Sequence, residues 1–210
     1  MKHPLLFIVL LFCSFSVTAQ YQPVTEEQKK EITGKMSQTS NKTNTMQCDF
    51  TQVKELSFMD DKTISEGKMF YKKTDKIRWE YTNPYQYIFS MDGENVNMTL
   101  GDKTNTIPAR QRKLFNGICK VMLSSISGTG LVDSPDFDTE FFVGSDDYKI
   151  VLLPKKKEEK DLFTSIQLYV NKSDGRVGTV EMVEKSGDKT TITLKNMQVN
   201  ITLNDKIFLQ

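Results

Sequence analysis

Residues able to carry acid–base or metal chemistry are scarce in this chain. The one histidine, His3, lies close to the N-terminus, although histidine is the commonest general base and a frequent zinc ligand. The carboxylate pairs Asp60-Asp61 and Asp146-Asp147 lack the spaced ligands and the glycine of a calcium loop. A hydrolase that uses carboxylates stays open as a minor alternative, but the sequence favours a protein that is not an enzyme and holds no metal or cofactor.

The remaining reactive side chains are two cysteines, Cys48 and Cys119. In an oxidising compartment they allow one intramolecular disulfide. Two separate buried thiols are an equal alternative, because free cysteine packs as a small hydrophobe. The sequence leaves both arrangements open.

Residues 1–19 have the pattern of a secretory signal peptide. Lys2 precedes the apolar run Leu5 to Phe15, and Val17-Thr18-Ala19 supplies the small residues of a cleavage site. The run is too short to be kept as a membrane span. Cys13 follows a bulky phenylalanine, whereas a lipoprotein signal needs small residues there. We therefore expect a soluble, exported protein.

The expected mature chain, residues 20–210, carries no net charge. The full sequence has 28 Lys and Arg against 27 Asp and Glu, and Lys2 leaves with the signal peptide. A neutral chain has no global field to attract nucleic acid, so nucleic acid is not an expected partner. No repeat, low-complexity linker or change of composition divides the chain, which predicts a single domain.

The elements that must position any site are mostly strands. Beyond residue 19 the chain has twenty threonines and one alanine, a composition that suits strands better than helices. One helix is nevertheless signalled by a capping-box pair, Thr25 and Gln28. Ile32 and Met36 give it a thin apolar stripe, and the polar run Ser37 to Asn44 is expected to end it.

From Thr45 the apolar residues alternate with a period of two, which predicts strands. Short turn-like breaks such as Asp92-Gly93 separate the first strands and predict sequential antiparallel neighbours. The first set of predicted strands begins at Thr45 and continues with 64–72, 76–82, 85–91 and 94–100. The second set comprises 137–143, 148–153, 163–171, 175–184, 190–197 and 207–209.

A second helix is predicted between these two sets of strands, because Leu114, Ile118, Met122 and Ile126 recur every four residues. Together the elements predict a mainly β (α+β) domain, a strongly curved antiparallel sheet with helices as a lid on its concave side. An apolar sheet face under a lid is either an ordinary core or a ligand cavity. Abundant methionines and a group of aromatic residues favour the cavity.

A set of segments in the first half of the chain carries a family resemblance: Phe50-Thr51-Gln52, Glu66 to Lys73, Ile77 to Tyr81, Pro84 and Asp92-Gly93. In these segments the chain resembles the LolA-type periplasmic carriers of outer-membrane lipoproteins. The stretch from Gly187 to Phe208 is compatible with the same family but less specific.

The resemblance implies an incomplete β-barrel whose hydrophobic cavity, covered by helices, takes the acyl chains of a lipoprotein. It implies a monomeric protein in the periplasm of a Gram-negative bacterium, with an inner-membrane ABC transporter complex as donor and the outer membrane as acceptor. A lipid- or glycolipid-binding or sensor module of the same fold, which does not shuttle cargo, is the alternative.

Residue parity then selects the candidate cavity lining, because alternate residues of a strand share one face. Three of the predicted strands and the second predicted helix contribute. The candidates are Met69, Tyr71, Ile77, Trp79, Tyr81, Val96, Met98 and Leu100 on strands, and Leu114, Ile118 and Met122 on the helix.

Lys73 occupies the turn position where members of this family carry a basic residue, often arginine, that helps to close the lid. Lysine cannot form arginine's planar bidentate contacts, so an exposed turn lysine is the alternative for Lys73. Asn97 and Thr99 also replace the aromatic residues of many relatives. This departure allows a different lipid as cargo.

Overall fold

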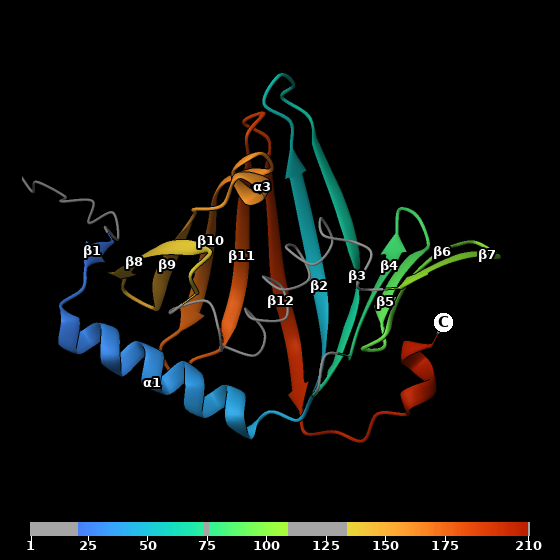
Figure 1. Ribbon diagram of the computed structural model, residues 1–210, viewed down its shortest axis with the longest axis horizontal. Helices are drawn as coiled ribbons and strands as arrows, with labels where there is room; N and C mark the ends of the chain where they lie inside the picture. The colour runs from blue at the N-terminus through green and yellow to red at the C-terminus, as the bar shows by residue number, and fades with distance from the viewer. Residues whose placement is uncertain (1–20, 74–75, 109–133, 210) are drawn as a thin grey trace, which may run out of the picture.

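A computed structural model describes residues 21–73, 76–108 and 134–209. Within them, twelve strands form one antiparallel sheet that does not close into a barrel (Figure 1). The strands follow one another as β8-β9-β10-β11-β12-β2-β3-β4-β5-β6-β7, with β1 paired to β8. Their bounds are β1 Gln22–Pro23, β2 Thr45–Glu55, β3 Lys62–Lys72, β4 Lys76–Asn83, β5 Tyr87–Met91, β6 Asn95–Leu100, β7 Lys103–Pro108, β8 Phe137–Val143, β9 Asp147–Pro154, β10 Phe163–Asn171, β11 Val177–Glu184 and β12 Lys189–Val199.

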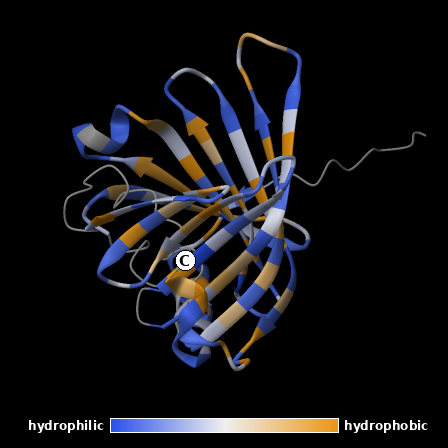
Figure 2. Ribbon diagram, turned by 90° about the vertical axis from the view of Figure 1, so that its right-hand side faces the viewer, coloured by the Kyte–Doolittle hydropathy of each residue, from blue (hydrophilic) through white to orange (hydrophobic). Residues whose placement is uncertain are grey.

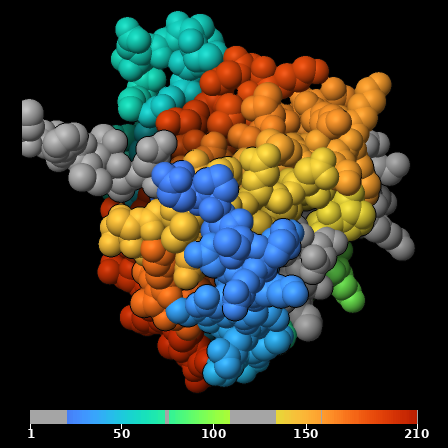
Figure 3. All heavy atoms as spheres, turned by 90° about the vertical axis from the view of Figure 1, so that its left-hand side faces the viewer, coloured from blue at the N-terminus to red at the C-terminus, as the bar shows by residue number. Residues whose placement is uncertain are grey.

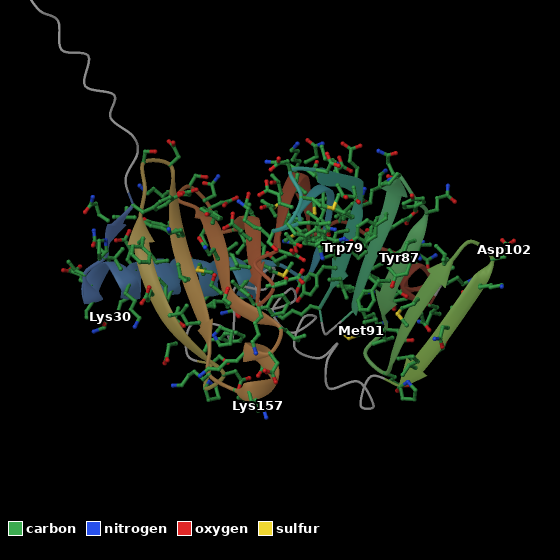
Figure 4. All side chains as sticks on the ribbon, turned by 90° about the horizontal axis from the view of Figure 1, so that it is seen from above. Lys30, Trp79, Tyr87, Met91, Asp102 and Lys157 are labelled. Carbon is green, nitrogen blue, oxygen red and sulfur yellow. The ribbon has the colours of Figure 1, made fainter. Side chains whose placement is uncertain are left out.

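The sheet is strongly curved, and its two faces differ in polarity. Seen from above, the strands follow an arc, with the labelled Trp79 and Met91 toward its inner side (Figure 4). Hydrophobic and hydrophilic residues alternate along the strands (Figure 2), as a sheet with one apolar face requires. The predicted mainly β, open curved architecture is confirmed.

Helix α1, Glu26–Lys42, begins with the predicted capping box. Thr25 Oγ1 accepts from the backbone N–H of Gln28 at 3.3 Å, and the Gln28 side chain accepts from Thr25 N–H at 2.8 Å. Ile32 and Met36 are buried in the same core as the inner side of the sheet. The helix crosses the lower ends of β8 to β12 in Figure 1, and Figure 3 shows it beside β8 and β9.

The helix continues through most of the polar run that was expected to end it. Tertiary contacts explain the extension, because Ser40 is buried and Thr39 Oγ1 donates to the carbonyl of Asp174 at 2.6 Å. Lys35 Nζ also donates to the carbonyl of Lys172. Polar residues therefore hold this end of the helix on the β10–β11 turn.

Four elements differ from the sequence-based expectation. Strands β1 and β7 and the short helix α3, Lys157–Lys160, are not among the predicted elements. The predicted strand Ile207–Leu209 is wrong: Ile207 and Phe208 belong to a 3₁₀ helix, η2, Asp205–Phe208, and Leu209 is its C-cap. The Asn204 side chain caps it by accepting from Lys206 N–H at 3.0 Å, and fully buried Phe208 anchors it.

The predicted helix around Leu114 to Ile126 and the predicted signal peptide lie outside the described residues. Among the helices that the structure does describe, none has both the length and the apolar character needed to cross a bilayer.

Candidate ligand-binding face

Strand register places all eight strand candidates on one side of β2 to β7. In an antiparallel pair, directly opposed residues point to the same face, so the register can be followed from strand to strand. The lowest row across the sheet contains Met46, Tyr71, Ile77, Met91, Val96 and Ile107. The next rows are Cys48, Met69, Trp79, Phe89, Met98 and Asn105, and then Phe50, Gly67, Tyr81, Tyr87, Leu100 and Lys103. We call this side the inner face.

Burial along the inner face decreases from the centre of the sheet toward its β7 edge. Met69 and Ile77 are 0% and 1% exposed, whereas Met98 is half-buried and Leu100 is 63% exposed. Tyr71, Trp79 and Val96 are buried, and Tyr81 is half-buried. The candidates therefore form a continuous apolar surface that reaches solvent at one end.

Phe50 organises the aromatic residues of this surface, although sequence reasoning did not select it as a site residue. Its ring centroid lies 4.5 Å from that of Trp79 and 5.0 Å from that of Tyr81, the latter pair edge to face. Gly67 makes room for it, because a Cβ there would lie 1.9 Å from the Glu80 carbonyl oxygen and 2.7 Å from the Phe50 ring. Gly67, within the family-like segment Glu66 to Lys73, is the sequence feature that could have indicated a large side chain packed opposite it.

Two polar groups are embedded in the aromatic cluster. Tyr81 Oη donates to Gln52 Oε1 at 2.9 Å, and burial raises the pKa of the Tyr81 phenol to about 12. Trp79 Nε1 is buried, and no acceptor among the described residues lies within hydrogen-bonding distance and angle of it. The Trp79 indole still lies close enough to the Tyr81 phenol to lower the pKa of that group, which opposes the effect of burial.

The other predicted site residues give a mixed picture. Lys73 is exposed, and its backbone N–H donates to the Asn44 carbonyl at 2.8 Å; its role in closing a lid stays a prediction.

Cys48 is a free thiol within the described part of the chain, and burial raises its pKa to about 12, which makes it unreactive. The remaining candidates, Leu114, Ile118 and Met122, and also Cys119, lie outside the described residues.

Asn97 and Thr99, the departures from the family pattern, lie on the opposite side of β6, which we call the outer face. Asn97 Oδ1 accepts from Thr106 Oγ1 at 2.8 Å, and the hydroxyl oxygens of Thr99 and Thr104 are 2.9 Å apart. These side chains link β6 to β7 and do not touch the inner face. They are therefore not part of the candidate lining, and a different lipid as cargo stays a prediction.

The outer face of β4 is covered by η2. The Arg78 guanidinium donates from Nη1 to the Ile207 carbonyl at 3.0 Å and from Nε to Glu80 Oε2 at 3.0 Å. Asp205 accepts from Lys72 Nζ at 2.5 Å and pairs with Lys76 Nζ at 3.4 Å. Helix η2 thus packs against the outer face of β4, the strand that carries Trp79 and Tyr81 on its inner face.

A pocket of about 280 Å³ lies at the upper end of the inner face. Tyr81 and Tyr87, whose rings are 5.9 Å apart, belong to both the inner face and the pocket wall. The two surfaces are therefore continuous. The remaining lining residues are Ser65, Asn83, Pro84 and Tyr85.

Comparison with known proteins agrees with this architecture. The family model of the outer membrane lipoprotein carrier protein LolA matches residues 41–209. An outer-membrane lipoprotein carrier protein of Methylococcus capsulatus is 27% identical over 166 residues, 78% of this chain and 76% of that protein. One from Chromohalobacter salexigens is 25% identical over 136 residues, 65% of this chain and 61% of that protein.

A solved structure of an uncharacterized conserved protein from Thermus thermophilus has the same fold. It aligns with a TM-score of 0.54 at 12% identity and covers 87% of this chain and 93% of that chain. The family match spans the inner face, η2 and most of the sheet. The chain therefore belongs to the LolA family of outer membrane lipoprotein carrier proteins.

Proposed function

We propose that this protein carries lipid-modified proteins through the periplasm, from the inner to the outer membrane, with their acyl chains held against the inner face. The continuous apolar inner face of an open sheet is the observation that supports this most strongly. Each buried CH₂ of a guest contributes about 0.8 kcal/mol, so an acyl chain laid along these rows is stabilised against exposure to water.

The chemistry of the inner face suits a guest of variable shape. Met46, Met69, Met91 and Met98 bring flexible, polarisable thioethers to it, and such side chains adapt to irregular apolar partners. The aromatic rings around Phe50 add large, flat contact surfaces. A carrier needs this adaptability, because its cargo must enter and leave without a covalent step.

No catalytic step is needed for this function. Release requires only an acceptor that binds the acyl chains better than the inner face does, which is a shift between two populated states. In this proposal an inner-membrane ABC transporter complex delivers the cargo, the outer membrane receives it, and the carrier works as a monomer.

Native mass spectrometry of the monomer with a diacylated lipopeptide tests the binding step, and a 1:1 complex is expected. Trp79, the only tryptophan of the chain, gives a second measurement, since a lipid with brominated acyl chains should quench its fluorescence. Met98→Glu on the inner face should weaken binding, and Thr99→Glu on the outer face of the same strand is the matched control. Equal binding by both variants would contradict the proposal.

A transfer assay separates a carrier from the alternative, a lipid-binding or sensor module that keeps its ligand. The loaded protein is mixed with vesicles, and the vesicle fraction is assayed for lipopeptide. Transfer to the vesicles supports the carrier. A complex that stays intact with excess vesicles would identify the alternative.

A further inference from the structure

The inner face changes from apolar to polar toward its upper end. Above the row of Phe50 and Tyr81, the register pairs Ser65 with Gln52. One step further along β2, Lys54 forms an ion pair with Glu184 at 3.1 Å. A guest on this face therefore meets hydrocarbon-like surroundings below and hydrogen-bonding groups above.

The pocket of about 280 Å³ lies at this transition. Tyr81 is half-buried and joins it to the apolar rows, whereas Tyr85 is 76% exposed and borders it toward solvent. Tyrosine has an apolar ring and a polar hydroxyl, the combination found where one end of a ligand is apolar and the other wet. We call this site the rim pocket.

The residues that line the rim pocket restrict the class of ligand. The six described lining residues include no charged side chain, so the wall offers no ion-pair partner to a phosphate group. The Ser65 hydroxyl and the Asn83 amide can donate hydrogen bonds. An uncharged group with carbonyl acceptors and an attached hydrocarbon fits this set.

We propose that the rim pocket binds the uncharged polar junction of a lipid, the ester-bearing glyceryl part. The acyl chains run from there down the inner face past Trp79, and the polar end leaves the protein at the Tyr85 side. The apolar path along β4 from Tyr81 to Ile77 covers four residues and is therefore about 13 Å long, at about 3.3 Å per residue. This assignment rests on the proposed function and adds a direction to the bound lipid.

The direction can be measured with phosphatidylcholines brominated near the ester or near the methyl end of one acyl chain. Two single-tryptophan proteins serve as reporters: the wild type, with Trp79, and Trp79→Phe/Tyr87→Trp, with the indole at the rim pocket. The rim reporter should be quenched most by bromine near the ester. Trp79 should be quenched relatively more by bromine near the methyl end.

The outcomes separate this inference from the proposed function. If both proteins bind the lipids and the order of quenching is reversed or equal, the direction is wrong while the proposed function stands. If neither protein is quenched and native mass spectrometry finds no complex, both are overturned.

A second measurement tests the hydrogen bonds without moving the tryptophan. Binding of a diester glycerolipid is compared with that of the diether lipid of the same chain length, which lacks the carbonyl acceptors. The wild type should bind the diester about five- to tenfold more tightly, as one or two hydrogen bonds would provide. Ser65→Ala/Asn83→Ala should lose this preference, whereas the nearby Thr82→Ala should keep it. A preference that survives the double substitution would overturn the assignment of Ser65 and Asn83.

Discussion

The two halves of the sheet are built from different side chains. In the half formed by β8 to β12, the core residues of β9 and β10 are branched aliphatics, and Ile150, Leu152, Leu168 and Val170 are all 0% exposed. In the half formed by β2 to β7, the inner face carries methionines and aromatic rings and ends in the exposed Leu100.

This difference indicates two mechanical roles within one sheet. Branched aliphatic side chains have few rotamers, above all the β-branched Ile150 and Val170, and they pack at the density of an organic crystal, so β9 and β10 form a rigid part of the wall. Methionines can change shape at little cost, so the inner face of β2 to β7 can adapt. We therefore expect lipid binding to depend on the second half, whereas truncation of a core side chain in the first half should lower stability and leave lipid binding unchanged.

The largest expected effect tests whether the backbones of β3 and β4, in the half formed by β2 to β7, can move apart. Gly67→Ala places a Cβ 1.9 Å from the Glu80 carbonyl oxygen, and it should lower the free energy of unfolding by about 4 kcal/mol or more. Gly178→Ala is the matched control on β11, because its Cβ would meet no atom within 4 Å. Urea denaturation followed by circular dichroism measures both variants. A mild effect of Gly67→Ala would show that these strands can shift apart.

The next effect concerns the support behind β4. Phe208→Ala removes a fully buried ring from η2 and should cost about 3–5 kcal/mol of unfolding free energy. Leu209→Ala, at a side chain 62% exposed, should change stability by less than about 0.5 kcal/mol. Thermal denaturation of the two variants makes the comparison. Similar melting temperatures would mean that η2 does not support the sheet.

A pair of truncations tests the division of roles directly. Leu168→Ala in the half formed by β8 to β12 should cost about 3 kcal/mol of stability and leave lipid affinity unchanged. Met98→Ala, at a half-buried position, should cost about 1 kcal/mol of stability and weaken lipid binding about fivefold. Denaturant titration and quenching of Trp79 by brominated lipid measure the two quantities. Equal losses of affinity in the two variants would remove the distinction between the halves.

The smallest expected effect is a pH-dependent ion pair on the outer face. The hydrogen bond from Lys72 lowers the pKa of the Asp205 carboxyl, with a further contribution from Lys76, although partial desolvation opposes the shift. A lowered pKa stabilises the folded state above the carboxyl's unfolded-state pKa, about 3.9. This contribution is lost as the pH falls through the folded-state value.

Asp205→Asn should accordingly melt slightly below the wild type at neutral pH, and the difference should vanish in acid and shrink in high salt. Asp102→Asn in the exposed β6–β7 turn is the control. Melting temperatures measured over a range of pH decide the matter. A difference that persists in acid would assign the effect to packing of η2 and not to its charge.

Much of this architecture can be predicted from local patterns. The Thr25–Gln28 capping box marks the start of α1. Strands such as Phe163–Asn171 have the predicted bounds, because side chains alternate between the two faces of a strand with a period of two residues. The same parity placed Met69, Trp79 and Met98 on one face, and the register confirms that they are neighbours. Alternation is a local property, so it is visible in the amino-acid order.

Other features depend on contacts between residues far apart in the chain. The apolar pattern of Ile207 to Leu209 suits a strand as well as a turn of helix, and the fit of Phe208 and Arg78 on β4 selects the helix. The polar strand β7 exists because β6 supplies its hydrogen-bond partners. Phe50 becomes the centre of the aromatic cluster only because Gly67 lies opposite it. The order of residues thus specifies which way each side chain points, whereas folding selects its neighbours, because burial and hydrogen bonding are properties of the assembled sheet.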